Sequence, residues 1–360
     1  MEIKLIGEPK IIMSNPHSNH KYFGWPTAIR LKNGKIAVAC SGFRLRHICP
    51  FGKAVISFSE DEGETYTPPA AVIDTPLDDR DGGLTVFGES GLIYSSFNNT
   101  RNFQRSQPQA TAYDKAYLDT ISDAQEKEYL GATYRISYDN GVTYGEIFKS
   151  PVTSPHGPVE LSDGTILWVG RTFSAEDKQL HGDVVAAYTM NLKGGTEYIG
   201  QIDNITDLES DVAPLSCEPH TIELDDGRLL THIRVQTSDG KHFTIYQSES
   251  SDKGRTWTKP VRLLPLLGGS PPHILKHSSG ALVCTYGYRQ PPFGVKVMIS
   301  FDNGATWDID HDLYVNGVSG DLGYPSSVEL ADGSIITIFY ARPEKGASAV
   351  IMQQKWSFEK

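Results

Sequence analysis

The chain repeats one eight-residue pattern, Ser-x-Asp-x-Gly-x-Thr-aromatic, four times. The copies are Ser59–Tyr66 (SEDEGETY), Ser137–Tyr144 (SYDNGVTY), Ser250–Trp257 (SSDKGRTW) and Ser300–Trp307 (SFDNGATW). Each follows a run in which apolar and polar residues alternate. Asp and Gly favour tight turns, and an Asp side chain can accept hydrogen bonds from backbone amides. Each copy therefore predicts a turn between two antiparallel strands, with the aromatic residue packed beneath it.

A second repeat alternates with the first. Six turn dipeptides each stand between two apolar runs, at Asn33-Gly34, Ser90-Gly91, Asp163-Gly164, Asp226-Gly227, Ser279-Gly280 and Asp332-Gly333. Their glycines are 53 to 73 residues apart. Six hairpins at this spacing predict an all-β, six-bladed β-propeller with four-stranded blades. We expect one domain, residues 1–360.

Three local features refine this prediction. The third blade has only a degenerate turn motif, Asn191–Thr196 (NLKGGT), and the sixth has none. We expect the N-terminal strand, residues 3–9, to complete the sixth blade and close the ring. Residues Gln107–Tyr129 are rich in Ala, Asp, Lys, Glu and Gln, which predicts a short helix inserted in the second blade. The insertion is interpreted equally well as a lid, a contact surface or a neutral addition.

Composition limits the partners. There are 33 Lys and Arg against 44 Asp and Glu, a net charge of −11, which argues against nucleic acid as the partner. No apolar run reaches the length of a membrane span, and residues 1–10 do not resemble a signal peptide. We expect a cytoplasmic protein with no membrane partner. The sequence leaves open a homo-oligomer and a secreted form trimmed of its signal.

The starts of the six innermost strands converge on the propeller axis, and they are unusually polar. They are Tyr22–Pro26, Asp78–Gly83, Ser154–Pro158, Cys217–His220, Ser270–His273 and Asp321–Pro325. A lone histidine or aspartate at such a place is more often structural than catalytic. Ionisable residues around one axis at all these positions instead favour a concave active site.

The turn motif on a six-bladed propeller resembles the sialidase superfamily, over essentially the whole chain. In that family a Glu on the fourth blade activates a Tyr on the sixth, and the Tyr attacks the anomeric carbon. The resemblance places Glu218 and Tyr324 in these roles. It also places Arg234 and Arg289 among three arginines that hold a substrate carboxylate. A neutral Tyr is a poor nucleophile and needs an adjacent base, so the pairing is chemically sound.

Two family features are missing. Trp25-Pro26 stands where the first arginine is expected, and the loop that carries the family's acid/base Asp has none. We therefore expect Asp79 or Asp81 to be the general acid, with Arg80 as a further anion contact. Arg44 and His47 of the altered loop, Trp25, and the histidines His156, His220 and His273 are expected to contact substrate. The histidines lack the spacing of metal ligands, so neither a metal nor a cofactor is expected.

These features predict a glycoside hydrolase of exo-sialidase type that removes a terminal, acidic sugar from an oligosaccharide or glycoconjugate. Two alternatives remain open. One is a polysaccharide lyase acting on uronate-containing oligosaccharides, with a His or Tyr as base and an Arg that neutralises the uronate. The other is a glycan-binding propeller without catalytic activity.

Overall fold

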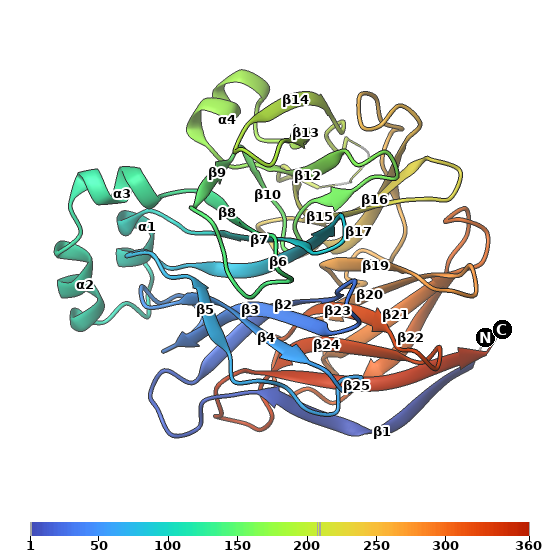
Figure 1. Cartoon of the computed structure of the whole chain (residues 1–360), viewed down its shortest axis with the longest axis horizontal. Coiled ribbons are helices and arrows are strands. Elements are labelled where there is room, and N and C mark those ends of the chain that lie inside the picture. Colours follow the sequence, from blue (N-terminus) through green and yellow to red (C-terminus); the bar gives the residue numbers. More distant parts are fainter. Residues whose placement is uncertain (1, 207, 209, 360) are drawn as a thin grey trace.

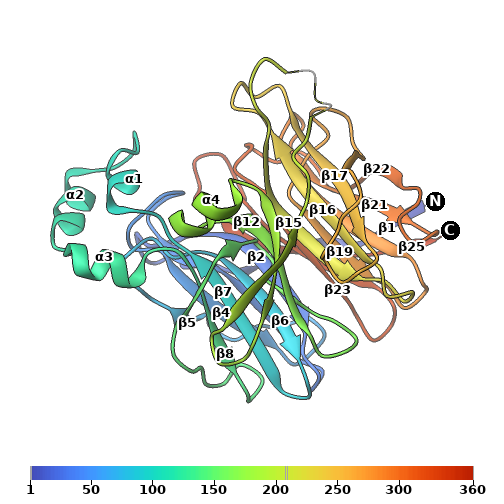
Figure 2. The same cartoon turned by 90° about the horizontal axis from the view of Figure 1, so that it is seen from above.

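Six β-sheets form a ring in the computed structural model, which describes residues 2–206, 208 and 210–359. The innermost strands of neighbouring sheets contact one another, and the first sheet also contacts the sixth. Figures 1 and 2 show the ring from two directions. The predicted all-β, six-bladed propeller is confirmed.

From the axis outwards, blades one to three are built as follows. Blade one contains β2 (Tyr22–Arg30), β3 (Ile36–Arg44), β4 (Lys53–Ser59) and β5 (Ala70–Ile73). Blade two contains β6 (Arg80–Phe87), β7 (Gly91–Phe97), β8 (Ala132–Ser137) and β9 (Phe148–Ser150). In blade three the innermost strand is split into β10 (Val152–Thr153) and β11 (Val159–Glu160), followed by β12 (Ile166–Thr172), β13 (Val185–Met190) and β14 (Thr196–Gln201).

Blades four to six follow the same order. Blade four contains β15 (Leu215–Glu223), β16 (Leu229–Gln236), β17 (Phe243–Ser250) and β18 (Val261–Arg262). Blade five contains β19 (Pro272–Lys276), β20 (Leu282–Tyr288), β21 (Gly294–Ser300) and β22 (Asp308–Tyr314). Blade six contains β23 (Gly323–Glu329), β24 (Ile335–Ala341), β25 (Val350–Glu359) and β1 (Glu2–Met13).

The antiparallel order divides the connections between the two ends of the ring. Innermost strands begin at one end, here called the upper end, and the turn dipeptides follow at the lower end. The connection from the second to the third strand returns to the upper end, and the Ser-x-Asp motifs again turn at the lower end. Any site built from strand starts is therefore surrounded by the second-to-third connections of all six blades.

The Ser-x-Asp motifs are hydrogen-bonded turns, as predicted. Asp252 accepts hydrogen bonds from the Thr256 amide at 2.8 Å, the Thr256 hydroxyl at 2.6 Å and the Ser250 hydroxyl at 2.8 Å. The same three bonds recur in the other copies. In the degenerate motif of blade three, Asn191 Oδ1 takes over this role and accepts from the Gly195 amide at 3.0 Å.

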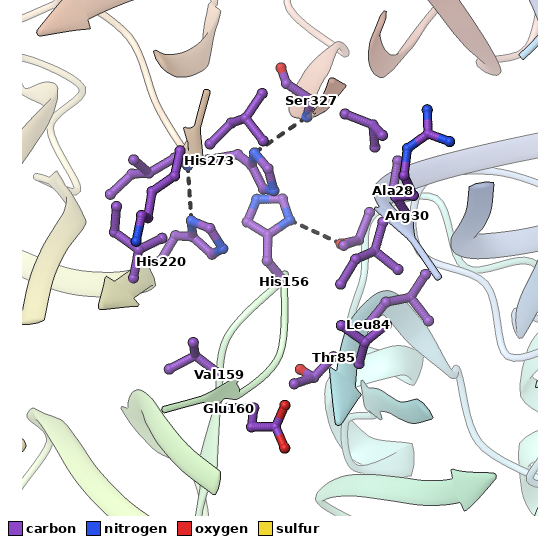
Figure 3. A pocket seen from close by; sticks show the side chains of 18 of the residues that line it. Ala28, Arg30, Leu84, Thr85, His156, Val159, Glu160, His220, His273 and Ser327 are labelled. Carbon is purple, nitrogen blue, oxygen red and sulfur yellow. Dashed lines mark hydrogen bonds between the residues drawn. The ribbon is translucent and has the colours of Figure 1, made fainter. Parts of the chain in front are cut away.

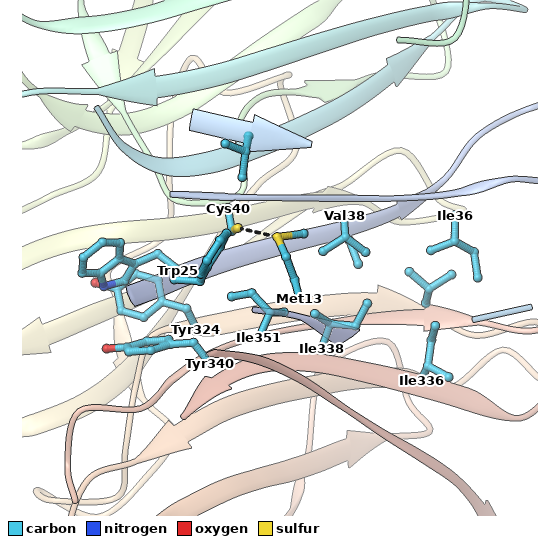
Figure 4. Packing of buried hydrophobic residues seen from close by; sticks show 14 of the residues in the cluster. Met13, Trp25, Ile36, Val38, Cys40, Tyr324, Ile336, Ile338, Tyr340 and Ile351 are labelled. Atoms are coloured by element: carbon cyan, nitrogen blue, oxygen red, sulfur yellow. Dashed lines mark hydrogen bonds between the residues drawn. The ribbon is translucent and has the colours of Figure 1, made fainter. Parts of the chain in front are cut away.

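The N-terminal strand closes the ring, as predicted. β1 pairs antiparallel with β25, from Glu2 opposite Glu359 to Met13 opposite Ile351. The sixth blade thus combines both ends of the chain. A buried cluster between blades one and six includes Trp25, Tyr324 and Tyr340 near the upper end, with aliphatic residues below them (Figure 4).

The helical insertion is larger than predicted. It consists of α1 (Arg101–Arg105), α2 (Ala112–Asp119) and α3 (Asp123–Tyr129), because Thr111 and Ser122 each cap the start of a new helix. A further helix in blade three, α4 (Ala175–His181), was not predicted. Both insertions join second to third strands and therefore belong to the upper end of the ring. In Figure 1, α1 to α3 lie at the left and α4 lies at the top. No helix in the described part of the chain is long and apolar enough to span a membrane.

Candidate active site

Four innermost strands carry the same distortion at their upper ends. In blades one, two, four and six, one extra residue bulges from the strand where it pairs with the second strand. The bulged positions hold Trp25, Asp81, Glu218 and Tyr324, with φ of 57°, 60°, 49° and 47°. Non-glycine residues rarely adopt positive φ, and bulges re-aim side chains beside functional sites. The bulges thus take these four side chains out of the regular alternation of their strands, at the end of the ring where the innermost strands begin.

Tyr324 and Glu218 meet across the axis. The Tyr324 hydroxyl donates a hydrogen bond to Glu218 Oε1 at 2.6 Å. Arg234 Nη1 donates to Glu218 Oε2 at 2.5 Å and to the Tyr324 oxygen at 3.2 Å. Cys217 pairs with Arg234 across β15 and β16, which explains why a separation of sixteen residues places Arg234 beside Glu218. The arrangement provides a base for the hydroxyl proton and a cation beside the phenolic oxygen.

The surroundings of Tyr324 set the conditions for its ionisation. Burial and the nearby Glu218 carboxylate raise the pKa of Tyr324 well above 10, while Arg234 and Arg289 lower it. Free phenolate is therefore rare. The hydroxyl can act as a nucleophile only if its proton moves to Glu218 during the attack.

Arg289 lies over the Tyr324 ring with unused donors. Its guanidinium carbon is 5.5 Å from the centre of that ring and 5.3 Å from the Phe243 ring. Its Nε donates to the Leu322 carbonyl at 3.0 Å, whereas the buried Nη2 has no hydrogen-bond partner among the described residues. The guanidinium carbon of Arg234 also lies 4.8 Å from the centre of the Phe243 ring, but its donors are used by Glu218 and Gln236.

Asp81 stands beside this group. Burial raises the pKa of Asp81 to about 7; Arg80 lowers it and the Glu218 charge raises it further. The side chain is 6% exposed, and no donor in the described part of the chain hydrogen-bonds to it. Asp81 can therefore hold a proton near neutral pH.

Asp79 and Arg44 occupy structural positions instead. Asp79 is fully buried and accepts hydrogen bonds from the Thr75 amide at 2.6 Å, the Thr75 hydroxyl at 2.8 Å and Asn98 at 3.3 Å. Arg44 is also fully buried and pairs with Asp78 at 2.6 Å. Neither side chain can reach a substrate, because both are enclosed by the connections between blades one and two.

Trp25 is enclosed as well, with 2% of its surface exposed. The Arg80 guanidinium lies 4.1 Å from the ring centre and that of Arg44 lies 4.9 Å away. Arg80 is itself held by the His47 carbonyl at 2.8 Å and by Asp78 at 3.4 Å. The sugar-stacking role expected of Trp25 is thus replaced by a packing role. Both hydrogen bonds of Arg80 use Nη1, so its Nε and Nη2 have no hydrogen-bond partner among the described residues.

The three histidines lie deeper in the channel and contact one another. Their ring centres are 4.4 to 5.1 Å apart, and each Nδ1 bonds to a different blade. His220 bonds to the Ile274 amide and His273 to the Ser327 amide of the next blade, whereas His156 reaches across to Thr27 of blade one (Figure 3). They form the inner wall of a cavity of about 1160 Å³ along the axis, which extends to Arg30, Glu160 and Glu329 near the lower-end turns. Glu218 and Tyr324 do not line this cavity, and no hydrogen bond joins them to the histidines among the described residues.

The histidine cluster is neutral. Burial lowers the pKa of His220 to about 3 and those of His156 and His273 well below 6.5. Within the described residues, no group of three or more His, Cys, Asp or Glu side chains could hold a metal ion.

His47 belongs to a second polar group, which was not predicted from the sequence. Its Nδ1 lies 3.1 Å from Asp321 Oδ1 and 3.1 Å from the Tyr22 hydroxyl, which donates to the same Asp321 oxygen at 2.8 Å. Arg342 Nη2 donates to the other Asp321 oxygen at 2.9 Å. Asp321 is three residues before Tyr324, so a signal was present in the sequence, but its partners come from distant segments.

Gln236 and Phe243 were also missed. Gln236 lies two residues after Arg234 on the same strand, where an alternation argument could have found it. Phe243 begins β17 and reads as an ordinary strand residue.

Comparison with known proteins agrees with this fold. A family model described as a BNR repeat-like domain matches residues 119–337, more than half of the chain. No curated protein matches the chain.

Several solved structures share the architecture. A protein of unknown function from Dyadobacter fermentans is 19% identical, with 99% of each chain covered and a TM-score of 0.75. A sialidase from Streptococcus pneumoniae is 12% identical over 97% of this chain and 70% of that one, with a TM-score of 0.65. An α-L-arabinanase from Penicillium chrysogenum, complexed with arabinobiose, is 14% identical over 99% and 98%, with a TM-score of 0.60. At these identities the likeness shows the fold alone.

Proposed function

Because the chain belongs to the BNR repeat-like domain family and has a propeller fold that sialidases and an arabinanase share, we propose that it is a glycoside hydrolase acting on an acidic sugar. One observation carries the proposal: the 2.6 Å hydrogen bond from the Tyr324 hydroxyl to Glu218, with Arg234 beside both groups. Sialidase-type retaining enzymes are the known exception that uses Tyr in place of a carboxylate nucleophile.

The reaction follows from these contacts. Tyr324 Oη attacks the anomeric carbon while its proton passes to Glu218 Oε1, and the bond from that carbon to the leaving-group oxygen breaks. Arg234 Nη1 stabilises the negative charge that develops on the phenolic oxygen. Water then cleaves the glycosyl-tyrosine, and Glu218 returns the proton to Tyr324. Two displacements at one carbon retain the configuration of the sugar.

Arg289 supports an acidic substrate. Arg44 and Arg234 each donate to protein acceptors through Nε and both Nη atoms. Arg289 Nη2, in contrast, is buried above the ring of Tyr324 and has no partner among the described residues. A buried, unpaired guanidinium donor is costly, and a substrate carboxylate would remove that cost. An acidic sugar is therefore favoured over a neutral one.

A proton donor must also protonate the leaving group. Of the two aspartates expected from the sequence, Asp79 is engaged in its own buried hydrogen bonds, whereas Asp81 lies close enough to Arg80 and Glu218 for their charges to change its pKa. Its pKa of about 7 keeps it protonated in mildly acidic solution.

A uronate lyase is the second candidate, and His47 favours it. An imidazole with a free Nε2 could remove the proton next to a carboxylate held by Arg289. The product would be an unsaturated sugar that absorbs ultraviolet light, whereas hydrolysis releases a saturated reducing sugar.

The test is a screen of the purified protein against sialosides, ulosonosides, uronate-containing oligosaccharides and arabino-oligosaccharides, with reducing sugar and ultraviolet absorbance measured together. We expect that an acidic glycoside releases reducing sugar and that the ultraviolet absorbance does not increase. The variants Tyr324→Phe and Glu218→Gln should lose about a thousandfold or more in kcat and still bind the substrate. An increase in ultraviolet absorbance would favour the uronate lyase. Binding without turnover, or full activity in both variants, would overturn the proposal.

A further inference from the structure

The connection between β3 and β4 holds His47 at the upper end of blade one. Its backbone is anchored on both sides: Arg44 pairs with the buried Asp78 at 2.6 Å, and Arg46 pairs with the buried Asp114 of α2. The Phe51 ring packs 4.7 Å from the ring of Tyr117 of α2. The helical insertion thus supports the loop that carries His47.

The hydrogen bonds around Asp321 fix the tautomer of His47. Burial alone would raise the pKa of Asp321, but hydrogen bonds from His47, Tyr22 and Arg342 hold it below its usual range, so Asp321 is a carboxylate and can only accept. The Tyr22 proton is already donated to Asp321. His47 Nδ1 must therefore carry a hydrogen atom and donate it. Its Nε2 is then free to gain and lose a proton.

Nε2 points away from these partners. No described residue hydrogen-bonds to it, and 42% of the His47 side chain is exposed. Trp25 packs against the ring, at 4.9 Å between ring centres, and Tyr324 belongs to the same buried cluster as Trp25. A carboxylate that orients an imidazole and leaves its second nitrogen exposed is the arrangement used for proton transfer.

Asp81 is less suited to the same task. Asp81 is 6% exposed, and the charge of Glu218, the base that serves Tyr324, raises its pKa. The group that leaves a terminal sugar is the rest of the glycan, which must extend towards solvent. An exposed imidazole on the rim can reach that oxygen more readily than a buried carboxyl group can.

We propose that His47, oriented by Asp321, is the general acid and base of this site, and that Asp81 holds a sugar hydroxyl. This proposal rests on the proposed hydrolase function. In the first step the Nε2 proton goes to the leaving-group oxygen as its bond to the anomeric carbon breaks. In the second step Nε2 takes a proton from the attacking water, whose oxygen bonds to the anomeric carbon as Tyr324 departs. Asp321 is a positioning residue.

The charges that face His47 predict its pH dependence. Burial lowers the pKa of His47 below 6.5, the hydrogen bond to Asp321 raises it, and Arg80 and Arg44 lower it; Tyr22 and Arg342 act through Asp321. The acid step needs protonated His47. Activity should therefore fall as pH rises through a value below 6.5, and this limb should disappear in His47→Gln.

The experiment compares leaving groups. For each acidic sugar of the screen, the 4-nitrophenyl glycoside, whose leaving group needs little protonation, is assayed beside the methyl glycoside. His47→Gln should lose about 10²–10⁴-fold in kcat/KM on the methyl glycoside and much less on the nitrophenyl glycoside. Asp81→Asn should lower kcat/KM by the same factor on the methyl and the nitrophenyl glycoside. Asp321→Asn should shift the pH limb and lower kcat more than it raises KM.

His20→Gln is the matched control. His20 lies on the neighbouring loop at the same end, is part-buried, and bonds through Nδ1 to the Phe43 carbonyl at 2.9 Å. It should retain wild-type activity on both glycosides. The proposal would be overturned if His47→Gln lost the same factor in kcat/KM on both glycosides. It would also be overturned if Asp81→Asn, and not His47→Gln, lost more on the methyl glycoside. Either result would leave the Tyr324 mechanism intact. Turnover of neither glycoside by the wild-type protein would count against the proposed function itself.

Discussion

The ionisable residues at the starts of the innermost strands predicted a site on the propeller axis. Which of these residues meet there depends on the direction of each side chain. Glu218 and Tyr324 each precede a proline and each adopt positive φ, a strain of about 1–3 kcal/mol per residue that the surrounding strands must hold. Trp25 shares both features and yet packs inwards beneath Arg80. A single sequence shows the bulge-prone dipeptide but not the direction in which the side chain leaves it.

Buried polar networks were equally hard to foresee. Asp79 and Asp81, which flank Arg80, look alike in the sequence, yet Thr75 and Asn98 donate hydrogen bonds to Asp79, while Asp81 lies within range of the Glu218 charge. Strand alternation places residues i and i+2 on one face only while the strand is regular. The bulge between Arg80 and Gly83 breaks that rule at this point.

The raised pKa of Asp81 makes stability depend on pH. Its folded-state value of about 7 exceeds an unfolded value near 3.9, so between these values the folded protein binds more protons than the unfolded chain. The free energy of unfolding should therefore decline as pH rises from about 4 to about 7. Asp81→Asn cannot ionise and should show a smaller decline when urea unfolding is measured at pH 5 and pH 8. Parallel curves for the two proteins would contradict the buried placement of Asp81.

At the scale of elements, the turn motifs were the most predictable part of the chain, because their hydrogen bonds lie within eight residues. They are also remote from the proposed chemistry, at the lower end. Asp252→Ala removes the acceptor of three hydrogen bonds and should lower the free energy of unfolding by about 1–2 kcal/mol. The kcat value should not change. A loss of activity at full stability would show that the motifs act on the site.

The helical insertion was predicted as one helix and is three, because the polar composition signalled a helix but two capping residues divide it. Its contacts with blade one include the ion pair between Arg46 and Asp114, residues 68 apart in the sequence, which no local pattern reveals. The interpretation as a support for the His47 loop came from the structure alone.

Removing the ion pair between Arg46 and Asp114 should lower both the stability and the activity of the protein. Asp114 is 1% exposed, and Asp114→Ala removes both the partner of Arg46 and the capping hydrogen bonds from Thr111, at a cost on the order of 3 kcal/mol. If the insertion supports the His47 loop, kcat on the methyl glycoside should fall as well. The double variant Asp114→Ala with Arg46→Met should recover part of the stability. Unfolding midpoints and kcat measured together separate the two effects, and unchanged kcat in a less stable Asp114→Ala would contradict a supporting role.

For the whole molecule, six hairpins and four turn motifs were sufficient to predict the ring, since repeats reveal topology even where single elements are ambiguous. The net charge of −11 proved a weak guide to the site. Many carboxylates lie in turns at the lower end, whereas Arg234 and Arg289 lie beside Tyr324 at the upper end. An acidic protein can thus hold a locally cationic site.

Closure by β1 should govern the stability of the ring. This strand forms the outer edge of blade six and joins the two ends of the chain. Deletion of residues 2–13 would expose the edge of β25 and uncover Trp356, which is fully buried. We expect the shortened protein to unfold at a markedly lower temperature or to aggregate, as measured by calorimetry and light scattering. Unchanged thermal unfolding would show that closure contributes little.

The central claim is that Tyr324 is the nucleophile. It is tested most directly by treating the protein with a slow-reacting fluorinated glycoside of the acidic sugar found in the screen, followed by peptide mass spectrometry. We predict a mass gain of one glycosyl unit on the peptide that contains Tyr324, and none in Tyr324→Phe. A glycosyl group on a different residue, or turnover that persists in Tyr324→Phe, would contradict the account.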